Sequence, residues 1–300
     1  MRLIIKIINN RNFLLIFSLT LGLTLGKGVE YLKPYVLWFL AVAMIFSSTS
    51  FRLKVLKDYR RFARITIVSF LLNYVVFGLV LLAMGHLLIK EKDLWWGLVV
   101  IAATPPGVAI IPFTVMYKGD TDYAMVGVLG VYILAIVVSP LILQLFVPHA
   151  SISPWKVVMI MVQVILIPLL LSRLLLWKRI FPTVQKIRGK VVNWAFALII
   201  YTIVGLNRSA IFGELGLLFK LALVLFVAMF VLGLLYEYLF RRRVDYGHRV
   251  AQNLMLTIKS SGFAAGTAVA LFGERSALPS ALLAVFVILY LVTTGFIYNK

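Results

Sequence analysis

Ten long apolar segments occupy most of this 300-residue chain, and only short stretches separate them. Apolar residues make up 63% of the sequence and charged residues only 13%. A water-soluble globule could not remove so much apolar surface from water, whereas a bilayer solvates it directly. The pattern predicts an all-α polytopic membrane protein with ten transmembrane helices, because a helix satisfies its backbone hydrogen bonds internally. The segments cover residues 13–27, 34–50, 66–89, 94–118, 122–146, 155–177, 191–207, 213–238, 250–272 and 277–298.

Basic residues gather on one side of these segments. Of the 30 lysines and arginines, 21 lie in the termini and loops that share a side with the N-terminus, mainly at residues 52–64, 178–190 and 241–249. Cytoplasmic loops carry such an excess, so we expect a multi-pass protein of the cell (inner) membrane with both termini in the cytoplasm. The expected partner is the lipid bilayer; the bases lie in short loops, which indicates topology rather than nucleic-acid binding. No obligatory protein partner is predicted.

Lys259 stands about ten residues inside the ninth segment, roughly 15 Å along a helix and near the middle of a hydrocarbon core about 30 Å thick. An ionisable group at that depth is costly, and its usual explanation is a functional site. Ser260, Ser261 and Gly262 follow it. Hydroxyls can satisfy freed backbone groups and glycine tolerates unusual dihedral angles, so we expect a break in the helix here.

The fourth segment has a matching interruption at Thr104, Pro105, Pro106 and Gly107. Two adjacent prolines remove two amide donors, so a continuous helix is not expected. Five segments separate the two breaks, which predicts a single membrane domain (1–300) built as a five-plus-five inverted repeat of residues 1–150 and 151–300. Inverted repeats with broken helices at mid-membrane are typical of secondary transporters.

Both breaks begin new half-helices, near Val108 and Phe263, whose N-terminal dipole ends would favour an anionic group. The hydroxyls of Ser260, Ser261 and Thr104 could orient such a group. Other polar residues could line a cavity: Asn193, Tyr201, Asn207, Gln163, Tyr132 and Thr114. The chain has no cysteine and no constellation of histidine, serine or paired carboxylates at spanning depth, so neither an enzyme, a metal site nor a cofactor is predicted.

These two regions resemble the bile acid:sodium symporter family and its bacterial relatives. The resemblance is carried by Pro105–Ala109, Lys118–Asp120 and Ser139–Leu141 in the first half, and by Ser261–Ala265, Leu271–Gly273 and Ala277–Leu282 in the second. It implies ten spans, cytoplasmic termini, and fourth and ninth helices that are broken and cross each other.

The chain departs from the family pattern where the resemblance implies sodium ligands. Ile110 and Ile111 stand where sodium-coupled members have Ser-Asn, Met255 where they have a glutamate, and Lys259 where they have glutamine. Asn73 matches the position of a glutamine ligand. Sodium needs several hard oxygen ligands, so sodium coupling is possible but not expected. Lys259 could replace the ion or bind substrate, carry a proton, or form a structural ion pair.

We therefore predict a secondary active transporter of a small or amphipathic organic anion that works by alternating access without sodium coupling. One alternative is a proton-linked or uncoupled efflux carrier of the auxin-efflux type, and another is a membrane receptor or scaffold without turnover. The candidate substrate- and ion-binding residues are Lys259, Ser260, Ser261, Gly262, Thr104, Pro105, Pro106, Gly107, Thr114 and Asn73.

Overall fold

The computed structural model describes residues 11–26, 28–50, 58–147 and 154–298, and this part of the chain is helical apart from short turns and one isolated β-bridge. Six of its helices are long and apolar enough to cross a membrane, so the predicted all-helical polytopic membrane protein is confirmed. They span Val29–Ser48, Tyr59–Leu88, Thr121–Phe146, Phe181–Leu206, Leu215–Phe240 and Arg275–Tyr298. Two shorter apolar helices cover Phe13–Thr24 and Ser261–Phe272.

The elements, in chain order, are α2 (Arg11–Thr24), α3 (Val29–Leu32), η1 (Lys33–Tyr35), α4 (Val36–Ser48), α5 (Tyr59–Phe70), η3 (Leu71–Val76), α6 (Phe77–Leu88), α7 (Lys92–Ala103), α8 (Ile110–Met116), α9 (Thr121–Phe146), α10 (Pro154–Met161), η4 (Val162–Leu166), α11 (Ile167–Leu174), α12 (Phe181–Leu206), α13 (Arg208–Gly213), α14 (Leu215–Phe226), η5 (Val227–Val231), α15 (Leu232–Phe240), α16 (Tyr246–Thr257), α17 (Ser261–Phe272), η6 (Arg275–Ala277) and α18 (Leu278–Tyr298).

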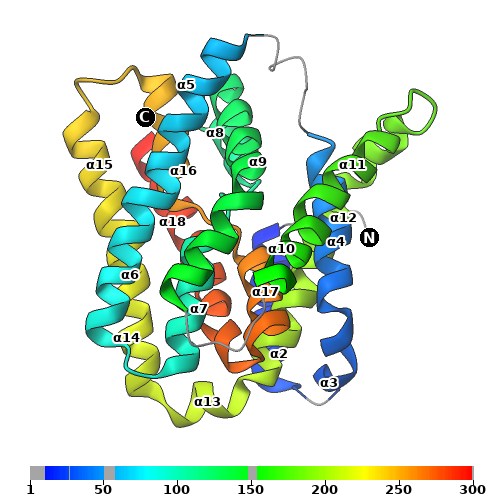
Figure 1. Ribbon diagram of the computed structural model, residues 1–300, viewed down its shortest axis with the longest axis vertical. Coiled ribbons are helices and arrows are strands. Elements are labelled where there is room, and N and C mark those ends of the chain that lie inside the picture. The colour runs from blue at the N-terminus through cyan, green and yellow to red at the C-terminus, as the bar shows by residue number, and fades with distance from the viewer. Residues whose placement is uncertain (1–10, 27, 51–57, 148–153, 299–300) are drawn as a thin grey trace.

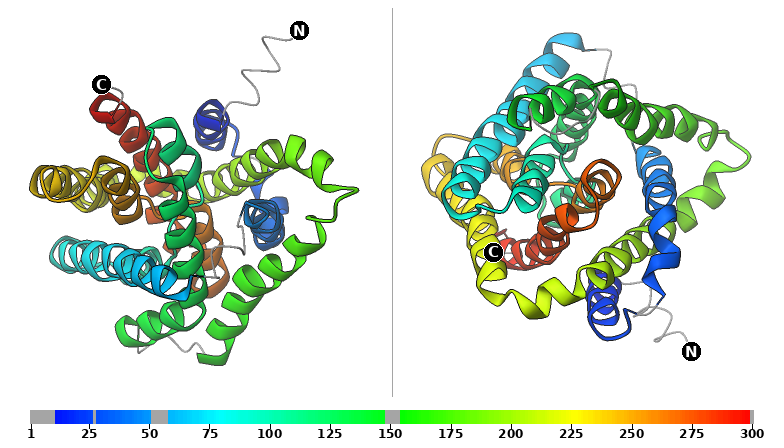
Figure 2. Two further views of the ribbon diagram at one scale, coloured as in Figure 1. Left: turned by 90° about the horizontal axis from the view of Figure 1, so that it is seen from above. Right: turned by 60° about the horizontal axis from the view of Figure 1, so that its bottom comes forward.

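The helices form two groups (Figure 1). In the first, which we call the panel, α12 packs along α2 and α4, and α11 packs along α4. In the second, the core, α5 packs on α9, and α7 and α18 both pack on α17. Figure 2, seen from above, shows the panel beside the core. The two groups meet at α17, which contacts both α4 and α12, and at α9, on which α10 packs.

Two apolar segments of the core are interrupted in their middle. Helix α7 ends at Ala103 and α8 begins at Ile110, while α16 ends at Thr257 and α17 begins at Ser261. The first interruption contains the two prolines, whose rings and missing N–H groups stop a helix. The extended stretches meet in an antiparallel bridge between Pro106 and Lys259. Residues about 150 positions apart are thereby joined at one point.

The seventh predicted segment, 191–207, starts earlier than hydropathy indicates. Helix α12 begins at Phe181, with Pro182 in its first turn. Proline suits that position because its fixed φ matches the helix and its missing N–H would have had no partner there. The added turns carry Lys186, Arg188 and Lys190, which are good helix formers but too polar for a hydropathy window to include. One of these residues, Arg188, lines a cavity that is described below.

Candidate functional site

The site is organised by the crossing of the two interrupted segments. The backbone N–H of Gly107 donates to the Ile258 carbonyl (2.9 Å), and that of Ser260 donates to the Pro105 carbonyl (3.2 Å). A side-chain Cβ at Gly107 would lie 3.1 Å from the Lys259 carbonyl oxygen, so the close approach favours glycine. The crossing therefore satisfies backbone groups that the helix breaks leave open.

The side chain of Lys259 is almost fully buried, with 1% of its surface exposed. Its ammonium donates to three oxygens: Asn73 Oδ1 at 2.9 Å, the Ala102 carbonyl at 3.1 Å and the Thr104 carbonyl at 2.7 Å. The two carbonyls are available because α7 ends at Ala103, and the last carbonyls of a helix have no partner within it. The C-terminal end of a helix dipole also favours a positive charge.

Two aromatic rings and one amide complete the surroundings of Lys259. The ammonium lies 4.6 Å from the ring centroid of Tyr74 and 5.3 Å from that of Phe77, within the range of a cation–π interaction. Asn73 donates its amide N–H to the Met255 carbonyl (3.1 Å), which turns its oxygen toward the lysine. In the described part of the chain, no carboxylate pairs with Lys259. Three neutral oxygens and two rings therefore surround Nζ of Lys259.

The predicted site residues separate into two sets. Gly107, Ser260, Ser261 and Gly262 line a cavity, together with part of Lys259. The other five are buried and are not part of the cavity wall. Among these, Thr104 and Thr114 donate their hydroxyls to carbonyls one turn earlier in their own helices, Asn73 binds the lysine, and the remaining two are Pro105 and Pro106.

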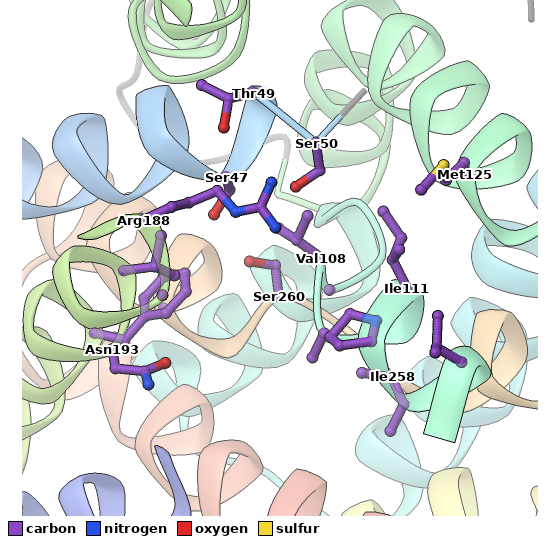
Figure 3. Close-up of a pocket in the computed structure, with 18 of the residues that line it drawn as sticks. Ser47, Thr49, Ser50, Val108, Ile111, Met125, Arg188, Asn193, Ile258 and Ser260 are labelled. Carbon is purple, nitrogen blue, oxygen red and sulfur yellow. The ribbon is translucent and has the colours of Figure 1, made fainter. Parts of the chain in front are cut away.

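The cavity has a volume of about 990 Å³ and lies between the panel and the core. One wall comes from α4, α11 and α12, and the other from the crossing and the start of α9. Figure 3 shows the Arg188 side chain extending into this space, with Ser47, Ser50, Asn193 and Ser260 around it. Among the residues that the structure describes, three cationic residues and no aspartate or glutamate line the cavity. Its positive walls would attract anions.

The panel and the core are in close contact beyond the inner end of this cavity. A Cβ on Gly262 would lie 2.4 Å from the ring of Phe196, and a Cβ on Gly266 would lie 2.9 Å from the side chain of Leu40. Glycine at both positions thus lets α17 approach α12 and α4 closely. Further along, Lys33 of the panel forms an ion pair with Glu274 of the core. The cavity therefore opens toward one end of the molecule and is closed at the other.

Several lining or neighbouring residues were not predicted from the sequence. Tyr74 and Phe77 read as ordinary apolar residues of a spanning helix, and Arg188 as part of a basic loop. The proline at the start of α12 and the helix formers after it are the only signals that Arg188 is helical. No sequence signal places it at the cavity.

The chain is similar to a transporter family and to a curated bacterial protein. The model of the SBF-like CPA transporter family matches residues 13–299. A curated protein of Bacillus subtilis (strain 168), "Uncharacterized sodium-dependent transporter YocS", is 24% identical over 272 residues, which cover 89% of this chain and 83% of that protein.

Proposed function

Because the chain belongs to the SBF-like CPA transporter family, whose type is the bile acid:sodium symporter, we propose that it carries a small or amphipathic organic anion across the membrane by alternating access. Its membership in this transporter family agrees with the resemblance found in the sequence. The observation that carries the proposal is the cavity between two groups of helices, whose walls, as far as the structure describes the chain, contain cationic residues and no carboxylate. Such a cavity suits a ligand with a negative group and an apolar body.

The proposed topology is ten spans arranged as a five-plus-five inverted repeat in the inner membrane, with both termini in the cytoplasm. Its support is that helices occur at every predicted segment within the described residues, and that the breaks fall five segments apart. Segments three and eight, which are equivalent in this repeat, each contain a π-helical turn, Leu71–Val76 and Val227–Val231, and segment six contains another at Val162–Leu166. In this orientation the cavity faces the cytoplasm and the Lys33–Glu274 ion pair lies on the outer side.

We propose that the Lys259 ammonium takes the place of a coupling cation. Three oxygens at 2.7–3.1 Å surround it as they would surround a bound ion, and the ammonium is attached to the chain. Coupling to sodium is then not needed to keep the crossing intact. This reading differs from the sodium dependence in the name of the Bacillus relative, and that name describes the relative alone.

The test is flux in proteoliposomes, measured with labelled aromatic and aliphatic carboxylates and sulfonates. We expect saturable flux of at least one anion above that of protein-free vesicles, at equal rates in sodium and potassium buffers. Flux of none of them would overturn the transport function. Flux that requires sodium would overturn the role given to Lys259 but keep the transporter.

A further inference from the structure

Two of the three cationic residues at the cavity are already engaged. Lys259 binds the three oxygens described above. Arg173 donates to the Ser48 carbonyl and, through Nε, to the Ser172 hydroxyl (3.1 Å), which ties α11 to the end of α4. Arg188 is different: within the described part of the chain it makes neither a hydrogen bond nor an ion pair, although it lines the cavity. Its guanidinium is therefore available to a ligand.

The chemistry around Arg188 specifies what it could bind. A guanidinium is planar, always charged, and matches the two oxygens of a carboxylate or sulfonate. The side chains of Val108, Ile111 and Ile258 form an apolar part of the other wall, at the crossing (Figure 3), and the hydroxyl-bearing residues Ser47 and Ser260 are also in the lining. One unpaired cation next to apolar surface fits one negative group on an apolar body.

We propose that Arg188 binds the single carboxylate or sulfonate of an amphipathic monoanion, whose apolar part lies against the crossing. This inference rests on the proposed function, since the bound anion would be the transported one. Arg188 belongs to α12 of the panel, whereas Ile258 and Ser260 belong to the core. A ligand that touches both groups binds differently when they separate, and such differential binding is what lets a ligand shift a conformational equilibrium.

The binding test compares naphthalene-2-sulfonate with the neutral naphthalene-2-sulfonamide, using thermal stabilisation of the purified protein. The variants are Arg188→Gln, which removes the charge, and Arg188→Lys, which keeps it but loses the planar fork. Lys186→Gln is the matched control, because Lys186 is an exposed cation two residues away in the same helix that does not line the cavity. Melting without ligand shows whether each variant is folded.

We expect the sulfonate, and not the sulfonamide, to stabilise the wild type. Arg188→Gln should weaken sulfonate binding by about tenfold or more, as for loss of a hydrogen bond to a charged group. Arg188→Lys should bind with intermediate affinity, and Lys186→Gln as the wild type does. Equal binding of the two compounds, no binding of the sulfonate by the wild type, or unchanged binding by a folded Arg188→Gln variant would each overturn the proposal.

The same proteins in proteoliposomes separate this inference from the transport function. Binding that depends on Arg188 without any flux would leave the anion site standing and refute transport. Flux in the wild type that Arg188→Gln leaves unchanged would refute the site and leave transport standing. The two hypotheses therefore fail in distinguishable ways.

Discussion

The substitution Lys259→Ala tests the site most directly, because it removes the ammonium that binds three oxygens at the crossing. It leaves Asn73 Oδ1 and the carbonyls of Ala102 and Thr104 without their common donor. Each of the three buried acceptors left unpaired costs about 1–3 kcal/mol. Part of this cost is offset, because the variant no longer buries an ammonium, whose desolvation costs several kcal/mol. We expect the unfolding free energy to fall by about 3 kcal/mol as the net result.

The variant should also gain a property that the wild type lacks. Removal of the long side chain leaves a space bordered by three oxygens, which a sodium ion could enter. If sodium bound there with a Kd of about 10 mM, about 100 mM sodium would restore about 1.4 kcal/mol. The wild type should respond equally to sodium and potassium, because its own ammonium fills the site.

The assay is thermal unfolding of the purified protein in sodium, potassium and N-methylglucamine chloride. Lys220→Ala serves as the control, because Lys220 is an exposed lysine within the apolar helix α14. We expect a lowered melting temperature for Lys259→Ala, partly restored by sodium alone, and little change for Lys220→Ala. A wild type stabilised by sodium, or a Lys259→Ala variant as stable as the wild type in potassium, would refute the reasoning.

Three further predictions concern the contacts around the site. Gly262→Ala should cost about 1–3 kcal/mol and reduce flux, because its methyl group meets the ring of Phe196, and Phe196→Ala should restore flux in the double variant; no loss in the single variant would contradict this. Glu274→Gln should open the side opposite the cavity mouth, because the ion pair of Glu274 with Lys33 holds the panel to the core. A single cysteine introduced at the cavity floor, in a chain that has none of its own, should then be labelled faster from that side. Unchanged labelling would show that the ion pair does not keep that side closed. Asp245 accepts the backbone N–H of His248 at the start of α16, which lowers the pKa of its carboxyl, so Asp245→Ala should reduce the melting temperature at neutral pH. Because a lowered pKa stabilises only while the carboxyl is ionised, this difference should shrink as the pH falls through that pKa, and a difference independent of pH would contradict the assignment.

The breaks in the helices were predictable because local chemistry decides them. Pro105 and Pro106 cannot continue a helix in any surroundings, and the charge of Lys259 at mid-segment demanded partners whatever the fold. The structure places both at the crossing of α7–α8 and α16–α17. The segment positions also followed from hydropathy, since each apolar run has to be removed from water.

The partners of these residues were not predictable, because they depend on tertiary packing. Four of the five groups around the Lys259 ammonium are backbone carbonyls or aromatic rings, and nothing in a sequence shows that they lie near a lysine. Arg188 was indistinguishable from the basic residues that set topology. Arg188 lines the cavity because α12 runs beside the crossing, and that packing is a tertiary feature.

The attachment of the Lys259 ammonium to the chain has an electrical consequence. A charge that is part of the protein returns with it at the end of each cycle, so it contributes nothing to the net charge moved. An anion carried without a companion cation then makes transport electrogenic. A potential of about 100 mV is worth about 2.3 kcal/mol per charge, or a roughly 50-fold concentration ratio. Across a membrane that is negative inside, this voltage would drive a monoanion out of the cell, so the fixed ammonium would favour export of the anion over its uptake.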